Sequence, residues 1–287
     1  MAKPHGKMVN VKGRKMHVCT MGIGKKNIVL LPGLNCPLPS VEYAPLMREL
    51  AKKHTVSIVE LFGYGHSDSA DTPRTNENYT GEIREALTIA GINPPYVLMP
   101  YSASGIYAEY YASIYPSEVA GLILLDSTPT VETVAKEWTE FFEDNAELEP
   151  YYEGDEEQPL NESEIEKLTA EYLLHGYTLE ELEEFEEVPN DMDTIMAQDM
   201  ALLQNIIEVI KLPFPKEIPV LVFSSGYDGH DEEERAEHEQ RSVDHMARFG
   251  EQAKHIIIEN STHTDIAYHK DFVKIICKEI YEFLMEE

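Results

Sequence analysis

The chain has 287 residues, of which 43% are hydrophobic, and its formal net charge is −30. This length suffices for one large domain with a substantial core. So strong a negative charge argues against binding nucleic acid or an anionic membrane through broad electrostatics. No apolar run approaches the roughly 18 residues of a membrane span, and the first residues lack the apolar segment of a signal peptide. We therefore expect a cytoplasmic protein without a membrane span.

The three cysteines, Cys19, Cys36 and Cys277, are odd in number and widely separated. They lack the C-x-x-C spacing of zinc sites, so neither a disulfide framework nor a metal site is expected. His238 and His245 lie seven apart on a charged helix without a third ligand, and we interpret them as surface residues. The sequence therefore predicts a protein that needs no metal and no cofactor.

The acidic residues are concentrated in one segment. Residues 131–210 hold 25 Asp and Glu against two lysines. Such a concentration of acidic residues is usually only a solvated helix face. The functional alternative is a surface that repels anionic substrates and tolerates cationic ones.

Buried strands alternate with helices on both sides of this segment, which predicts a parallel sheet with helices on both faces. Before it we expect strands at 8–11, 16–20, 27–31, 55–59, 96–100 and 119–125, with helices at 40–53, 78–90 and after 103. After it we expect strands at 219–224 and 255–258 and helices at 231–249 and 265–286. Between them the periodicity is helical only, and Trp138, Phe141 and Phe142 are interpreted as its apolar core. The predicted organisation is a core of residues 1–129 and 212–287 with an inserted helical lid at 130–211.

Ser102 stands at the tip of a tight turn between a strand and a helix, in the stretch Pro100-Tyr101-Ser102-Ala103-Ser104-Gly105. Such a turn pushes the hydroxyl clear of the backbone, beside the unpaired N–H groups of the next helix. A serine before a helix can also be an ordinary N-cap. Other residues of the sequence are therefore needed to distinguish a nucleophilic Ser102 from a helix N-cap.

An activated serine needs a base, a carboxylate that orients the base, and N–H donors for the oxyanion. His263 follows the last expected strand, at the edge where ligands bind in α/β folds. Asp228 and Asp126 also follow strands. We favour Asp228 as the orienting acid and expect Asp126 to cap the next segment.

The order Ser102, Asp228, His263 and the turn around Ser102 resemble the α/β-hydrolase superfamily, in particular its lidded serine hydrolases. Leu30-Leu31-Pro32-Gly33-Leu34-Asn35 resembles the strand end that carries the oxyanion hole in that family, and Gly63-Tyr64-Gly65-His66-Ser67 resembles its G-x-G-x-S turn. The resemblance implies an eight-stranded, mostly parallel sheet and an oxyanion hole formed by the backbone N–H groups of Leu34 and Ala103. Pro32 stands in place of the usual histidine and Pro100 in place of the first elbow glycine.

The resulting hypothesis is a serine hydrolase in which Ser102, His263 and Asp228 cleave a carboxylic ester of a neutral or cationic small molecule. An aminopeptidase or amidase of the same fold is the alternative enzyme, because acidic side chains of the lid could hold a substrate amine. A catalytically inactive ligand-binding protein is the alternative outside enzymes. A dehalogenase or epoxide hydrolase of this fold would need Asp as nucleophile, and position 102 is Ser.

Overall fold

The computed structural model describes residues 5–144, 161–188, 191–226 and 232–285. Its eight strands are β1 (His5–Val11), β2 (Arg14–Met21), β3 (Asn27–Leu31), β4 (Thr55–Glu60), β5 (Tyr96–Pro100), β6 (Val119–Leu125), β7 (Val220–Ser225) and β8 (Lys254–Ile258). They form one sheet in the order β1-β2-β4-β3-β5-β6-β7-β8. β2 pairs antiparallel with β1 and β4, and the remaining pairs are parallel. The eight-stranded, mostly parallel sheet predicted from the sequence is confirmed.

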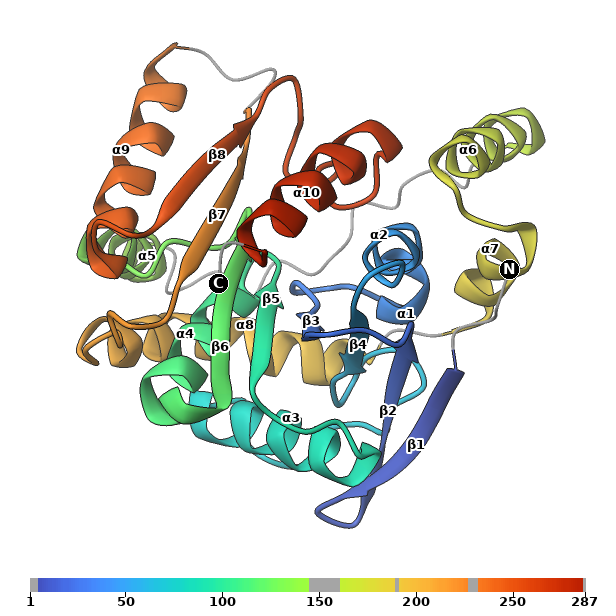
Figure 1. The fold of residues 1–287 in the computed structure, drawn as a ribbon, viewed down its shortest axis with the longest axis horizontal. Helices are drawn as coiled ribbons and strands as arrows, with labels where there is room; N and C mark the ends of the chain where they lie inside the picture. Colours follow the sequence, from blue (N-terminus) through green and yellow to red (C-terminus); the bar gives the residue numbers. More distant parts are fainter. Residues whose placement is uncertain (1–4, 145–160, 189–190, 227–231, 286–287) are drawn as a thin grey trace.

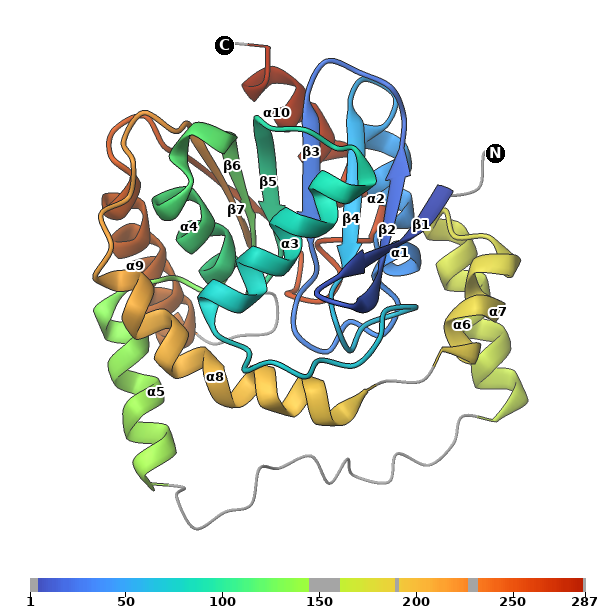
Figure 2. The ribbon, with the colours of Figure 1, turned by 90° about the horizontal axis from the view of Figure 1, so that it is seen from below.

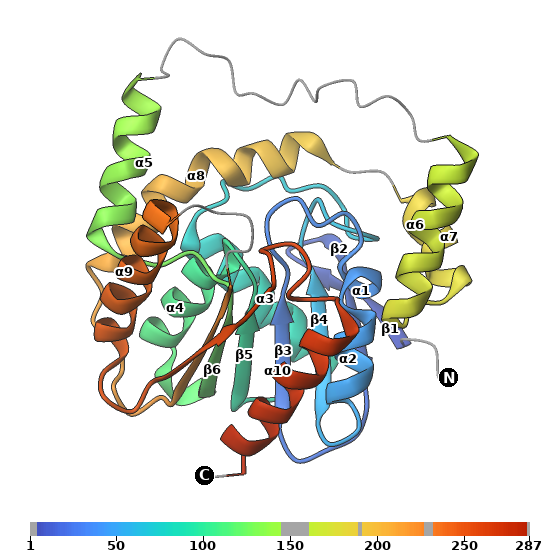
Figure 3. The same ribbon diagram turned by 90° about the horizontal axis from the view of Figure 1, so that it is seen from above.

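The helices that flank the sheet are α1 (Pro39–Glu42), α2 (Ala44–Leu50), α3 (Asn76–Ala90), α4 (Ser104–Ile114), the short 3-10 helix η1 (Pro116–Glu118), α9 (Glu232–Phe249) and α10 (Lys270–Phe283). α3 and α4 cover one face, and α2 and α10 cover the other (Figures 2 and 3). The central strands are therefore buried on both sides, as their continuous apolar runs predict. The largest differences from the predicted helices are that the helix expected at 40–53 is divided at Tyr43 and that the last helix begins only at Lys270.

The chain between β6 and β7 forms α5 (Glu132–Asp144), α6 (Glu162–His175), α7 (Leu179–Glu187) and α8 (Met192–Ile210). Among the described residues of this insertion (residues 130–211) there is no strand. α5 stands at one end of α8, and α6 with α7 stand at the other end (Figures 2 and 3). Capping boxes start α6 at Asn161 and α7 at Thr178, so these acidic helices carry their own start signals.

α8 is fixed to the core by buried polar side chains. Tyr64 Oη donates to Gln198 Oε1 at 2.8 Å, and the Asn76 N–H donates to Asn205 Oδ1 at 3.0 Å. Asn205 Nδ2 in turn donates to the Arg74 carbonyl at 2.9 Å. Because an unpaired buried amide costs about 1–3 kcal/mol, these bonds hold α8 in one position on the sheet.

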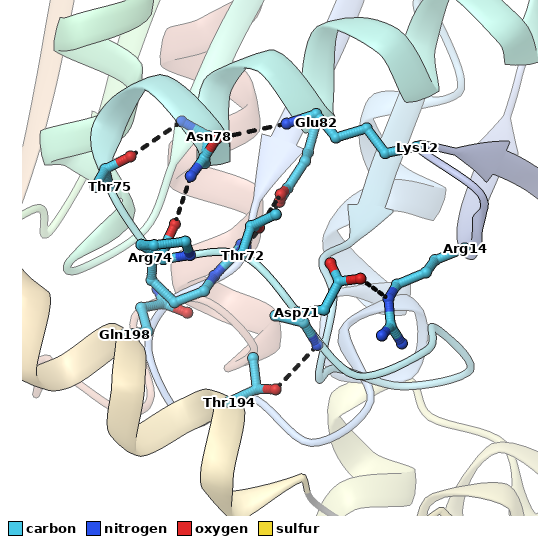
Figure 4. A network of polar contacts seen from close by, with 12 residues as sticks. Lys12, Arg14, Asp71, Thr72, Arg74, Thr75, Asn78, Glu82, Thr194 and Gln198 are labelled. Atoms are coloured by element: carbon cyan, nitrogen blue, oxygen red, sulfur yellow. Dashed lines mark hydrogen bonds and ion pairs between the residues drawn. The ribbon is translucent and has the colours of Figure 1, made fainter.

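Beneath α8 lies a buried ion pair between Arg74 and Glu82 (Figure 4). The side chains of both are fully buried, with Arg74 Nη1 at 2.9 Å from Glu82 Oε2, and Thr72 Oγ1 donates to Glu82 Oε1 at 2.9 Å. The pair joins the loop after β4 to α3, which begins at the N-cap Thr75 and ends at Gly91 (φ 84°).

Within the described part of the chain, no helix combines the length and the apolar character that crossing a bilayer requires.

Candidate active site

Ser102 lies in the turn between β5 and α4, at the centre of the sheet. Its φ is 54°, a left-handed conformation that a non-glycine residue adopts only when its surroundings enforce it. The Tyr101 N–H donates to the Leu31 carbonyl at 3.0 Å and the Ser102 N–H to the Leu125 carbonyl at 3.3 Å. The two neighbouring strands therefore hold the turn, and the serine hydroxyl projects from it.

Ser102, His263 and Asp126 form a continuous hydrogen-bonded chain. His263 Nε2 is 3.0 Å from Ser102 Oγ, and His263 Nδ1 is 2.6 Å from Asp126 Oδ2. The His263 side chain is 50% exposed, whereas that of Asp126 is 6% exposed. The imidazole thus reaches the surface where a substrate would lie, while its carboxylate partner is shielded from water.

Asp126 is held by the sheet and not by a helix end. Its Oδ1 accepts from the Ser225 N–H at 2.8 Å, and its own N–H donates to the Phe223 carbonyl at 2.8 Å. The prediction that Asp126 caps the next segment is therefore wrong, because its two carboxylate oxygens are used by β7 and His263. The favoured acid, Asp228, lies outside the described residues. The carboxylate on His263 Nδ1 is that of Asp126, the acid that the sequence analysis ranked second.

Tyr101, which precedes Ser102 in the same turn, supports His263. Its hydroxyl donates to the backbone carbonyl of His263, and the two rings stack with centroids 4.9 Å apart at 17°. Burial, followed by the charge of Asp126, raises the pKa of the Tyr101 hydroxyl, which keeps it a donor. Sequence reasoning missed this residue, because an aromatic side chain next to a nucleophile carries no pattern of its own.

Ser104 occupies the second glycine position of the elbow and bonds to the loop after β3. Its hydroxyl donates to the Pro32 carbonyl and lies 3.0 Å from Tyr79 Oη, which must then donate to it. Two of the three residues that depart from the family pattern, Pro32 and Ser104, are thus joined in one contact. At the first elbow position, Pro100 ends β5 and its carbonyl accepts from Ser127 Oγ at 3.2 Å.

The two amides predicted for the oxyanion hole lie on either side of Ser102. No bond from the Leu34 or Ala103 N–H to a backbone carbonyl occurs in residues 5–144, 161–188, 191–226 and 232–285. Gly33 lets the loop approach closely: a Cβ atom there would be 2.8 Å from Tyr101 Cδ1 and 3.2 Å from Ser102 Cβ. The Leu34 and Ala103 amides thus have no backbone acceptor among the described residues.

Two cavities open on Ser102 and His263. The first, of about 490 Å³, is lined by residues of α5 and α9 and is here called the α9 cavity; its wall includes Trp138, Arg241 and His245. The second, of about 340 Å³, is called the tyrosine cavity, and Tyr43, Tyr101, Tyr172, Tyr177 and Tyr268 line it. A bound molecule could thus extend in two directions from the serine.

One expectation about the α9 cavity is wrong, and another holds in part. His245 is buried at 3% exposure, not on the surface, because it pairs with Glu109 on α4 at 2.7 Å. For the aromatic side chains the expectation holds in part: Trp138 packs against the hydrophobic core and also lines the cavity, whereas Phe141 and Phe142 are 62% and 42% exposed. Among the described residues, no group of three potential ligands is arranged to hold a metal ion.

Curated relatives match only part of the chain. A protein named uncharacterized protein YbdG from Bacillus subtilis is 36% identical over 126 residues, which cover 44% of this chain and 39% of the relative. A pimeloyl-[acyl-carrier protein] methyl ester esterase from Stenotrophomonas maltophilia is 33% identical over 114 residues, 40% of each chain. The matched stretch therefore spans about two fifths of the length of these relatives.

Solved structures match nearly the whole chain at low sequence identity. Cfl2 from Burkholderia cenocepacia superposes with a TM-score of 0.68 at 18% identity, over 97% of this chain and 95% of Cfl2. The epoxide hydrolase VrEH1 from Vigna radiata gives a TM-score of 0.69 at 15% identity, over 99% of both chains. A family model described as the alpha/beta hydrolase fold matches residues 26–264. The resemblance predicted from the sequence is confirmed, and the chain belongs to the α/β-hydrolase fold family.

Proposed function

We propose that the protein is a serine hydrolase that cleaves a carboxylic ester of a neutral or cationic small molecule. The observation that carries this proposal is the hydrogen-bonded chain from Ser102 through His263 to Asp126, at the place where two cavities meet. Nucleophile, base and orienting carboxylate lie within hydrogen-bond reach of each other, which is the geometric requirement for an activated serine.

In the proposed reaction, His263 Nε2 takes the proton of Ser102 Oγ as the oxygen attacks the ester carbonyl. The amides of Leu34 and Ala103 donate to the oxyanion, and His263 then gives the proton to the leaving alcohol. Water, activated by His263, hydrolyses the acyl-enzyme and restores Ser102. Asp126 keeps Nδ1 protonated and stabilises the imidazolium, so the role that the sequence analysis gave to Asp228 passes to Asp126.

The substrate class follows from chemistry and charge. The relatives named methyl ester esterases support ester cleavage, whereas the structural neighbours named epoxide hydrolases share the fold alone. An epoxide hydrolase of this fold needs a carboxylate nucleophile, and Ser102 offers a hydroxyl. We propose further that the acidic insertion acts as a lid, whose negative field disfavours anionic substrates.

The proposal is tested by labelling with a fluorophosphonate probe. Ser102 should react, Ser102→Ala should not, and His263→Ala should lose labelling because the base is missing. A chain-length series of p-nitrophenyl esters and a panel of aminoacyl amides then separate an esterase from an aminopeptidase. A folded wild-type protein that never reacts with the probe, yet binds a ligand equally well as Ser102→Ala, would establish the binding-protein alternative instead.

A further inference from the structure

The tyrosine cavity combines an aromatic wall with a carboxylate. Tyr172 makes edge contacts with Tyr177 (centroids 5.3 Å apart, 83°), and lies 5.9 Å from Tyr268 at a tilt of 52°. On the side of the nucleophile, Tyr43 and Tyr101 meet at 6.1 Å and 71°. Rings at such different angles cannot stack on one flat group. These tyrosines line the cavity without forming one flat stacking surface.

Glu42 supplies a carboxylate to the wall of this cavity. Its Oε1 accepts from the Leu38 N–H at 3.2 Å, and the Cys36 thiol donates to the side chain. Both donors are neutral. In the part of the chain that the structure describes, no Lys, Arg or His forms an ion pair with Glu42.

The surroundings of Glu42 disfavour its charge. Burial raises its pKa, and the hydrogen bonds from Cys36 and Leu38 counter this only in part. Withdrawing a carboxylate from water costs free energy unless a cation pairs with it. The backbone at Glu42 is tied to the cavity wall, since Tyr177 Oη donates to the Glu42 backbone carbonyl at 2.7 Å. An apolar acyl chain would leave this cost in place, whereas a cationic group would remove it.

We propose that the tyrosine cavity binds an ammonium group of the substrate, with the tyrosine rings as cation–π partners and Glu42 as the counter-charge. This inference rests on the proposed function, since the same cavity opens on Ser102. Ring faces attract ammonium groups that lie within about 6 Å of the ring centroid, and quaternary ammonium groups are typical ligands of such aromatic walls. The substrate class narrows from neutral or cationic esters to esters with an ammonium group in the acyl or the alcohol half.

The catalytic test compares esters that differ only in charge. Acetylcholine is matched by 3,3-dimethylbutyl acetate, and p-nitrophenyl 4-(trimethylammonio)butanoate is matched by p-nitrophenyl 5,5-dimethylhexanoate. The wild type should prefer the cationic member of at least one pair by about tenfold or more in kcat/KM. Glu42→Gln, which keeps an oxygen for the Leu38 N–H, should lower this cationic-to-neutral ratio about tenfold. Equal kcat/KM within both pairs in the wild type would overturn the inference.

A matched control removes one charge from the same insertion at an exposed place. Glu166 lies on α6, the helix that also carries Tyr172, and its side chain is exposed. Glu166→Gln should leave the ratio unchanged if the cation is held locally. An equal fall in both variants would show that the general field acts and not the cavity.

A binding measurement separates this inference from the proposed function. The Ser102→Ala variant should bind choline about tenfold or more tightly than 3,3-dimethylbutan-1-ol in calorimetry, and the added change Glu42→Gln should abolish the difference. If Ser102 is labelled by the fluorophosphonate but choline shows no preference, the inference fails and the hydrolase stands. If choline binds selectively and Ser102 is never labelled, the cation site stands and the hydrolase fails.

Discussion

Ser104 donates a hydrogen bond from its side chain to the backbone carbonyl of Pro32, so the helix after the nucleophile is fastened to the loop that carries the Leu34 amide. The Tyr79 hydroxyl completes the contact from α3. Three separate segments are thus joined beside Ser102. The relative position of the two amides that would hold an oxyanion depends on this contact.

Replacing Ser104 by Ala should lower kcat of ester hydrolysis by about tenfold with a small change in KM, because one oxyanion donor shifts while the cavities remain. The free energy of unfolding should fall by about 1–3 kcal/mol, since the buried Tyr79 hydroxyl loses its acceptor. Steady-state kinetics and urea unfolding check both effects. Unchanged kcat in a destabilised variant would show that the contact is structural only.

Replacing Asp126 by Asn should lower kcat by about 10³–10⁴-fold, because an amide cannot hold the imidazole in the required tautomer. The matched change Asp228→Asn should cost far less if Asp126 alone orients His263. Both variants are compared with the same p-nitrophenyl ester. A larger loss of kcat in Asp228→Asn than in Asp126→Asn would instead identify Asp228 as the acid that orients His263.

The buried cluster around Glu109 should make stability depend on pH. Burial by itself would raise the pKa of Glu109, but His245, Arg248 and Thr130 outweigh it and leave the pKa below its usual value. In the unfolded chain the Glu109 carboxyl titrates at about pH 4.3. The stabilisation of the fold by ionised Glu109 is therefore complete above that pH, and it is lost as the pH falls through the lower pKa of the folded state.

Glu109→Gln should therefore lower the free energy of unfolding by about 3–5 kcal/mol at pH 7, because Arg248 loses its counter-charge. The difference from wild type should shrink below about pH 4. Urea unfolding at pH 7 and pH 3.5 measures it. The exposed pair Lys136–Glu140 gives the control: Glu140→Gln should change stability by less than about 1 kcal/mol at either pH.

The native cysteines should react slowly with a thiol reagent at pH 8. Cys19, Cys36 and Cys277 are all buried, and burial raises each thiol pKa, to about 12 for Cys19. Three equivalents of reagent should be consumed quickly only after unfolding. Rapid labelling of Cys36 in the native protein would mean that the tyrosine cavity, which it lines, opens widely in solution.

The sheet was predictable because buried parallel strands leave continuous apolar runs in the sequence. Ser102 and His263 could be found in this way, since position after a strand is visible in the sequence. The choice between Asp126 and Asp228 could not, because both follow strands and the contact between Asp126 and His263 depends on how the loops after β6 and β8 fold in three dimensions. The burial of His245 was hidden for a similar reason: its partner Glu109 lies 136 positions earlier.

The position of α8 has a consequence for how substrate preference could change. α5 contributes to the wall of the α9 cavity, while α6 and α7 contribute to that of the tyrosine cavity. α8, which lies between them, is attached to the core by Tyr64 and Asn76. The two cavity walls are therefore formed by separate helices of the insertion. Substitutions in α6 and α7 could therefore alter recognition of one half of a substrate while the other half and the reacting groups keep their places.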